Sequence, residues 1–267
     1  MIGAEGQRVG PGTIALVAVA TAGLVFLLAP VLIILIVSFS SGNYLSFPPP
    51  GLSLRWYQRF FGTPAWRQSI VVSVQVASLT MVFATVLGLG AALALVRGHF
   101  RGKAAVYGVV LSPMIVPTII TAIGLCFFFV KLKATGSILA MAIGHTVLAL
   151  PVVVIIITAT LQGFDLRLEL AALSLGASRL GALRRVTVPL IAPGVLSAAL
   201  FAFLTSFDEL LIPLFLSGVE VQTLTVRIWN SLVLEVDPTI AAVSSFLIAV
   251  TCAVLGVSAL VRRRGDA

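Results

Sequence analysis

Charged side chains are scarce in this 267-residue chain, at 10% of residues against roughly 25% in an ordinary soluble domain. Acidic residues are the rarest, with nine Asp and Glu in all. Cysteine is nearly absent: Cys126 and Cys252 both lie in apolar runs, with no His or acid close by in sequence. These shortages argue against a soluble domain, a disulfide framework and a cysteine metal site.

Residues for catalysis or nucleotide binding are missing as well. The segment Gly98–Ala104 (GHFRGKA) is the nearest approach to a phosphate-binding loop. It has one residue too few between its glycines, and Ala104 stands where Ser or Thr would bind magnesium. The two histidines and the few acids are not grouped as a nucleophilic or metal-dependent active site requires. We therefore expect no enzyme activity and no bound cofactor on this chain, which leaves an intramembrane enzyme without support.

Hydrophobic residues make up 60% of the chain, and the mean hydropathy is +1.16. A membrane span needs about 20 mostly apolar residues. Six stretches meet that length, and the first is too long for a signal-peptide core. The sequence thus predicts an all-α integral membrane protein with one domain over 1–267 and six transmembrane helices, at about 13–38, 69–96, 104–130, 137–160, 188–216 and 239–261.

Lysine and arginine are distributed unequally between the two sets of loops. One side carries Arg55, Arg59, Arg67, Lys131, Lys133 and Arg227. The other carries Arg8, Arg97, Arg101, Lys103, Arg167, Arg179, Arg184, Arg185, Arg262, Arg263 and Arg264. Because basic loops stay inside, this bias predicts that both termini and the loop 161–188 are cytoplasmic. The net charge of +8 therefore reflects topology, and we expect no nucleic-acid partner.

Several stretches carry signs of close packing or irregularity. Gly88 lies four residues from alanines on either side, which favours close approach of a neighbouring helix. Pro113, Pro117 and Pro151 predict kinks, which mark either a cavity or ordinary tolerated prolines. The stretch 188–216 would be about 43 Å long as one helix, more than the hydrocarbon core of roughly 30 Å, so we expect it to be broken.

The only acids within the apolar stretches are Asp208 and Glu209. Ser206 and Glu209 have the spacing of a capping box, which would start a half-helix at Ser206. Alternatively, Asp208 or Glu209 faces a water-filled path for a cationic solute, since carboxylates inside a membrane are costly and are usually functional. For His145, a neutral ring bonded to a backbone carbonyl and a proton relay are the two interpretations.

A short helix is expected inside the loop 161–188. Asp165 is its predicted N-cap and Gly176 its C′ residue. The helix carries two opposed apolar faces, one of Leu168, Ala171, Ala172 and Leu175, the other of Leu166, Leu170 and Leu173. A helix resting only on its own domain needs one such face, so the second predicts contact with another protein.

An aromatic segment follows the first long apolar stretch. Trp56, Tyr57, Phe60 and Phe61 lie among arginines after the run Pro48–Gly51. This pattern is typical of a helix anchored at the membrane interface. A docking surface for an extracytoplasmic protein is the alternative.

The loop 161–188 resembles the EAA loop of binding-protein-dependent ABC importer permeases. That motif reads Glu-Ala-Ala, three residues, Gly, nine residues, Ile-x-Leu-Pro; the matching positions here are Ala171, Ala172, Gly176, Val186, Val188 and Pro189. Leu170 occupies the Glu position, and Glu169 lies one residue earlier. The resemblance implies an ATPase-coupling loop that includes Asp165, Glu169, Leu170, Ala171, Ala172, Gly176, Ala177, Ser178 and Pro189.

Further segments resemble the spermidine/putrescine branch, in its second-permease type, although permeases for opines and other small organic solutes share them. They are Phe47–Tyr57, Gly144–Thr146, Ser206–Glu209 and Phe215–Gly218. The resemblance implies a type I importer bundle in a bacterial inner membrane. It implies a second permease, two cytoplasmic ATPases that bind ATP and magnesium, and an extracytoplasmic solute-binding protein.

Ser206, Asp208, Glu209 and His145 are the candidate substrate path. An ion-coupled secondary transporter using Asp208 or Glu209 is the alternative; it would leave the two-faced helix unexplained.

Overall fold

The computed structural model describes residues 11–234 and 238–265, and every regular element within them is helical. Arg8 lies outside these residues, and the side chains of Arg262, Arg263 and Arg264 are not described. The long helices are α1 (Pro11–Val37), α3 (Pro64–Arg97), α6 (Ile138–Gln162), α9 (Val188–Phe207) and α12 (Thr239–Gly265). The shorter ones are α2 (Arg55–Gly62), α4 (Lys103–Leu111), η1 (Ser112–Met114), α5 (Thr118–Lys131), α7 (Leu166–Ser174), α8 (Arg179–Ala182), η2 (Leu183–Thr187), α10 (Leu211–Leu216) and α11 (Leu224–Leu234).

Five helical segments in the described residues are long and apolar enough to cross a membrane. Four of them match predicted stretches, and the fifth, Arg179–Phe207, begins and ends nine residues earlier than the predicted 188–216. The third stretch, 104–130, is divided into 103–114 and 118–131, which meet at 98° and count as a sixth span only if taken together. The predicted kink at Pro113 and Pro117 is therefore a bend of nearly a right angle between two separate helical segments. Pro117 has extended backbone, at ψ 128°, and α5 begins after it.

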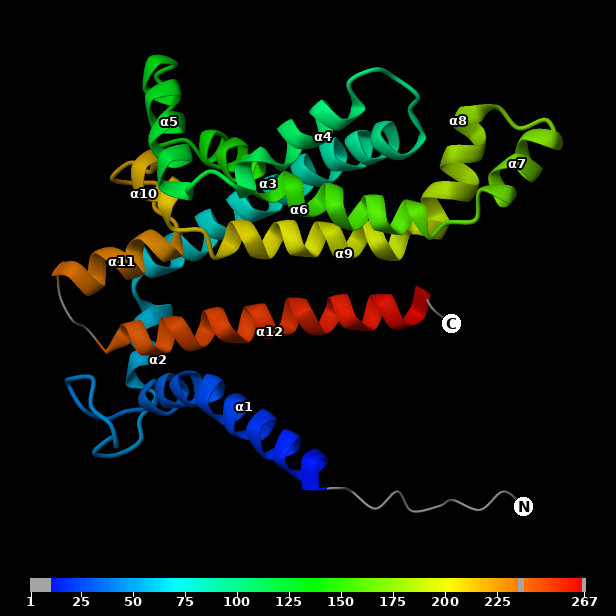
Figure 1. The fold of residues 1–267 in the computed structure, drawn as a ribbon. Helices are drawn as coiled ribbons and strands as arrows, with labels where there is room; N and C mark the ends of the chain where they lie inside the picture. The colour runs from blue at the N-terminus through cyan, green and yellow to red at the C-terminus, as the bar shows by residue number, and fades with distance from the viewer. Residues whose placement is uncertain (1–10, 235–237, 266–267) are drawn as a thin grey trace.

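The centre of the fold is a layer of three helices, α3, α6 and α9, which run side by side (Figure 1). Small residues allow them to approach closely. A Cβ added at Gly88 would lie 2.5 Å from Cγ1 of Val153, and one at Gly194 would overlap the side chain of Thr160. The packing seam predicted around Gly88 is confirmed, with α6 as its partner, and α6 runs through Pro151 as one helix.

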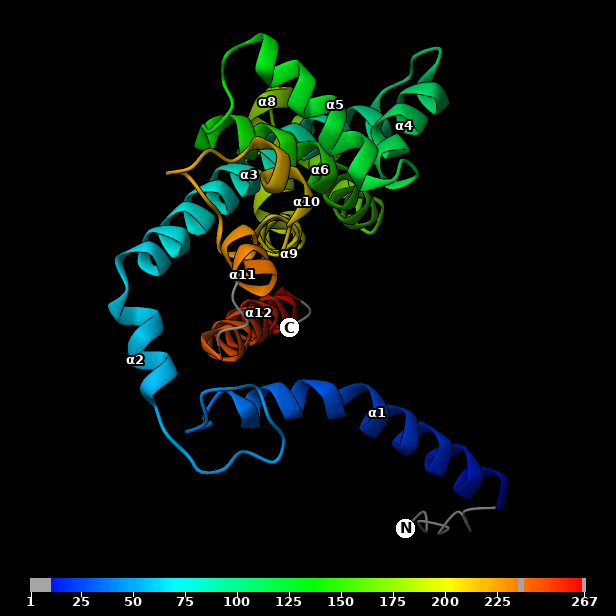
Figure 2. The same cartoon turned by 90° about the vertical axis from the view of Figure 1, so that its left-hand side faces the viewer.

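Two long helices stand outside this layer. α12 packs against α9, and α1 lies beyond α12 in both views (Figures 1 and 2). No residue in the most apolar part of α1 is buried by the rest of the chain. Its side chains are therefore free to contact lipid or another subunit.

The elements divide between two ends of the bundle. α7, α8, the 98–102 connection, the last turns of α12 and the first turn of α1 lie toward one end (right in Figure 1). α2, α5, α10 and α11 lie toward the other. The described ends of the chain therefore lie on the same side as the loop 161–188, as the predicted topology requires.

Two short helices border the end opposite α7. The aromatic segment forms α2, as predicted, but Trp56 and Phe60 are buried. The ring of Phe60 packs at 5.8 Å from Trp66 and 5.5 Å from Phe246, so α2 is held by α3 and α12. α11 was not predicted from the sequence, because its eleven residues are too few to span a membrane.

Candidate functional site

The short helix α7 has the two end signals that the sequence predicted. The Asp165 side chain accepts a hydrogen bond at 2.9 Å from a backbone N–H two residues further on. Gly176 has φ +90°, and its N–H donates to the Leu173 carbonyl at 3.0 Å. The Ala177 N–H donates to the Ala172 carbonyl at 3.0 Å, which completes a Schellman motif.

The orientation of α7 differs from the one that the sequence predicted. Neither apolar face rests as a whole on the bundle, because Leu168 of one face is 48% exposed and Leu170 of the other is 53% exposed. The side turned toward the chain carries Glu169, Ala172 and Leu173, which are half-buried. Large apolar side chains on the remaining surface are exposed: Leu166, Leu168, Leu170 and Leu175. A partner that covers α7 therefore meets leucines from both predicted faces.

The carboxylate of Glu169 holds α7 in this orientation. Its two oxygens lie 2.7 Å and 3.0 Å from the guanidinium nitrogens of Arg97. The Thr187 hydroxyl donates to the same carboxylate at 2.6 Å. Arg97 ends α3 and Thr187 ends η2, just before α9, so one side chain joins three segments. Neither partner was predicted from the sequence, although Arg97 is the first basic residue after its apolar stretch.

The end of the loop leads directly into the central helices. Ser178 begins α8, and its hydroxyl accepts from the Gly181 N–H at 3.1 Å. The chain then winds as the π-helix η2, and Pro189 lies in the first turn of α9, where its missing N–H costs least. The motif positions from Asp165 to Pro189 thus form a continuous path from α7 to α9.

The predicted break in 188–216 is present, but its cap is different. α9 ends at Phe207 and α10 begins at Leu211. Ser206 is buried inside α9 and is no N-cap, in contrast to the prediction. Instead, Oε1 of Glu209 accepts from the backbone N–H of Leu211 at 2.7 Å and of Ile212 at 3.2 Å. Glu209, the second residue of the predicted capping box, therefore caps α10 without Ser206.

Asp208 lines a pocket of about 230 Å³. The pocket lies between the end of α9, α11 and α12, and its wall includes Trp229, Thr225 and Ser244. Within the described residues, no side chain pairs with the Asp208 carboxylate. A carboxylate and an aromatic ring in one wall are the groups that attract an ammonium ion. No three His, Cys, Asp or Glu of the described residues are grouped to hold a metal ion.

The remaining two candidate residues lie in the helix packing. His145 is 1% exposed, and its Nδ1 lies 2.7 Å from Oγ of Ser206. The interpretation that the His145 ring bonds to a backbone carbonyl is therefore wrong for Nδ1, because α9 brings the Ser206 hydroxyl to that position. The four candidate path residues consequently divide: Asp208 lines a pocket, Glu209 caps α10, and Ser206 and His145 bond to each other.

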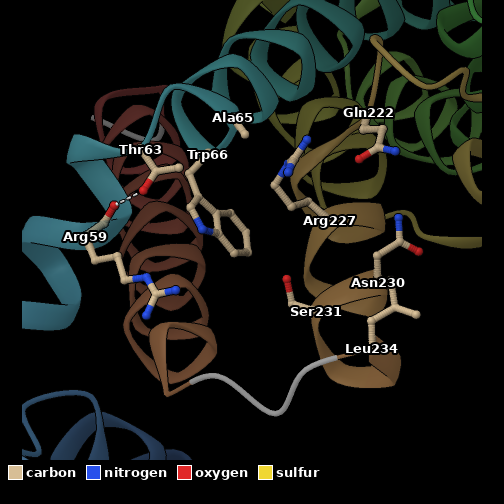
Figure 3. Close-up of a pocket in the computed structure, with 9 residues that line it drawn as sticks. All are labelled: Arg59, Thr63, Ala65, Trp66, Gln222, Arg227, Asn230, Ser231 and Leu234. Atoms are coloured by element: carbon tan, nitrogen blue, oxygen red, sulfur yellow. Dashed lines mark hydrogen bonds between the residues drawn. The ribbon is translucent and has the colours of Figure 1, made fainter. Parts of the chain in front are cut away.

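A larger pocket of about 420 Å³ lies at the end opposite α7 (Figure 3). The described residues of its wall include two arginines and are Arg59, Thr63, Ala65, Trp66, Gln222, Arg227, Asn230, Ser231 and Leu234. Arg227 donates from Nε to Ser69 at 2.7 Å, and burial lowers its pKa from the usual value. This pocket was not predicted from the sequence, because α11, which was not predicted either, supplies much of its wall.

Residues 84–266 match the family described as "Binding-protein-dependent transport system inner membrane component". The spermidine/putrescine transport system permease protein PotC of Haemophilus influenzae is 33% identical over 90% of this chain and 93% of its own. The putrescine transport system permease protein PotI of Escherichia coli is 32% identical over 85% of this chain and 83% of its own.

Solved structures with a similar fold include two ABC transporters. The chain resembles a bacterial ABC transporter that imports the acidic polysaccharide alginate, with a TM-score of 0.72 and 15% identity over 96% of this chain and 98% of that one. It also resembles an amino acid ABC transporter, with a TM-score of 0.60 and 17% identity over 78% and 98%. Such different cargoes on one backbone mean that the likeness concerns the fold alone.

Proposed function

This chain belongs to the family of binding-protein-dependent transport system inner membrane components, and from that premise we propose that it is the permease subunit of an ATP-driven polyamine importer. The names of its relatives support spermidine, putrescine or a similar small cation as the cargo. We propose a bacterial inner membrane location, with the α7 end and both termini in the cytoplasm. The excess of basic residues toward that end supports this orientation.

The partners follow from the same proposal. A second permease, expected to be a paralogue, completes the membrane part, and a solute-binding protein delivers cargo from outside. Two cytoplasmic ATPases bind ATP and magnesium, for which this chain has no phosphate-binding loop of its own. The uncovered surface of α1 supports a further membrane partner.

Exposed leucines on α7 support its role as the contact with an ATPase. Leu166, Leu168, Leu170 and Leu175 are costly in water, and an apolar groove on the ATPase would cover them. Movement of α7 would reach α3 through Arg97 and α9 through Thr187, because Glu169 joins all three. Such rigid coupling suits alternating access, in which packed helices move as bodies.

The pocket at Asp208 supports a cationic cargo, and we propose that it lies on the transport path. An ammonium group that leaves water needs a negative charge and acceptors nearby, and Asp208, Thr225 and the Trp229 ring supply them.

Matched amide substitutions test the cargo path. We expect Asp208→Asn to reduce spermidine uptake by about tenfold, the loss of one charge-assisted contact. We expect Glu209→Gln to retain most uptake, because its amide oxygen can still accept from Leu211 and Ile212. Uptake would be measured in vesicles that contain the assembled complex, with ATP hydrolysis as the control for assembly.

Two outcomes would contradict the proposal. Wild-type uptake in Asp208→Asn would remove the carboxylate from the path. Uptake that continues without ATP and stops when ion gradients are collapsed would favour the ion-coupled secondary transporter.

A further inference from the structure

A chain of buried hydrogen bonds joins the three central helices. His145 of α6 contacts Ser206 of α9 at 2.7 Å, from Nδ1 to Oγ. Ser206 Oγ lies 3.2 Å from Thr80 Oγ1 of α3, and Thr80 Oγ1 lies 3.2 Å from the Ala142 carbonyl of α6. All three side chains are buried. Water therefore offers none of them a substitute partner in this conformation.

The direction of these bonds follows from counting protons. A carbonyl oxygen only accepts, so Thr80 donates its single hydroxyl proton to Ala142. Thr80 then accepts from Ser206, which spends the only proton of the Ser206 hydroxyl. Ser206 must accept from His145, and the ring proton is therefore on Nδ1. The reverse direction would leave the Ala142 contact without a proton.

Nε2, the other ring nitrogen of His145, is unprotonated as a consequence. Nε2 carries a lone pair and has no hydrogen-bond partner among the described residues. A neutral ring protonated at Nε2 would present a lone pair to Ser206, whose proton is already used. Only the tautomer protonated at Nδ1 thus completes the chain.

We propose that His145, held in its Nδ1–H form, is the positioning residue for the end of α9 and for the acidic turn that follows it. Ser206 lies one residue before the end of α9 and two before Asp208. A bond that fixes Ser206 against α6 and α3 also fixes where the Asp208 carboxylate enters its pocket. The consequence for transport rests on the proposed function, whereas the assignment of the proton does not.

Nuclear magnetic resonance of the assembled complex, with 15N-histidine in this subunit alone, tests the proton assignment. The chain has two histidines, and His99 is exposed in the 98–102 connection, so His99→Gln leaves a single labelled ring. We expect an N–H signal from Nδ1 and an unprotonated Nε2. Replacing the acceptor by Ser206→Ala should shift the population toward Nε2–H. A ring protonated at Nε2 in the protein with Ser206 intact would overturn the proposal.

Two substitutions of His145, each of which places an amide where one of the two ring nitrogens was, test the positioning role. The amide of Asn occupies the place of Nδ1–H, whereas the amide of Gln reaches toward Nε2. We expect His145→Asn to retain the KM of spermidine uptake within about twofold, and His145→Gln to raise it by about two- to tenfold, the range of one lost hydrogen bond. ATP hydrolysis by the assembled complex should be similar in both.

The outcomes separate this proposal from the proposed function. Equal KM values for the Asn and Gln variants would show that the Nδ1 donor does not position the path. Absence of spermidine uptake in every variant and in the unmodified complex would contradict the proposal that spermidine is the cargo. The 15N resonances of the His145 ring would still show which ring nitrogen carries the proton.

Discussion

At the scale of single residues, the Glu169 carboxylate joins two other parts of the sequence. Arg97 lies 72 residues away and Thr187 lies 18 residues away, yet both contact one carboxylate. Exposed ion pairs usually contribute 0–1 kcal/mol, but this pair is two-pronged and mostly shielded from water, with side chains 25% and 14% exposed. The contact therefore stabilises the orientation of α7 more than a surface pair would.

A double-mutant cycle on Arg97→Gln and Glu169→Gln measures that contribution. We expect a coupling free energy of about 1 kcal/mol, because either single change already breaks the pair. The measurement is thermal unfolding of the purified protein in detergent. Arg101→Gln, an exposed arginine in the next connection, is the control and should change stability little. Additive effects of the two substitutions would contradict the contact.

At the scale of elements, close approach between α3 and α6 depends on the absence of a side chain. Gly88 faces Val153 with no space for a Cβ, whereas a Cβ added at Gly90, on the same helix, meets nothing within 4 Å. The two glycines cost the helix the same backbone entropy, so any difference between their substitutions reports packing.

Alanine at these two positions should have opposite effects. We expect Gly88→Ala to lower the free energy of unfolding by about 1–3 kcal/mol through overpacking, and Gly90→Ala to leave it unchanged or raise it. Adding Val153→Ala to Gly88→Ala should recover part of the loss. Thermal unfolding in detergent measures all three, and equal stability of the two alanine variants would exclude the close contact.

At the scale of the whole molecule, the connections that are rich in basic residues lie at the same end of the helix bundle. The 98–102 connection and the loop 161–188, both of which contain arginines, lie toward one end, together with the first turn of α1 and the last turns of α12 (Figure 1). Such clustering is what the positive-inside rule requires of cytoplasmic loops. The Asp208 pocket lies away from that end, among α9, α11 and α12.

Cysteine labelling tests the orientation directly. We expect Ser178→Cys to react with a membrane-impermeant thiol reagent only from the cytoplasmic side, and Tyr44→Cys only from outside. Tyr44 is 80% exposed and therefore accessible to the reagent. Cys126 and Cys252 are replaced by alanine in both variants. Labelling from the opposite sides would invert the topology.

Local rules were sufficient for much of this protein. The apolar stretches, the caps of α7 at Asp165 and Gly176, and the break after Phe207 depend on residues a few positions apart. A span needs only length and apolar composition, and a cap needs only one acceptor or one positive φ. The family resemblance of the loop 161–188 rests on the same short-range spacing.

The remaining features required contacts between distant segments. The rotation of α7 follows from Arg97, which no pattern within the loop contains. Glu209 rather than Ser206 caps α10, because Ser206 already bonds to His145 and Thr80 on other helices. The pocket at Asp208 exists only where α11 and α12 meet α9. A side chain with several available partners is assigned by which of them folding brings within reach, and that depends on the packing of the whole chain.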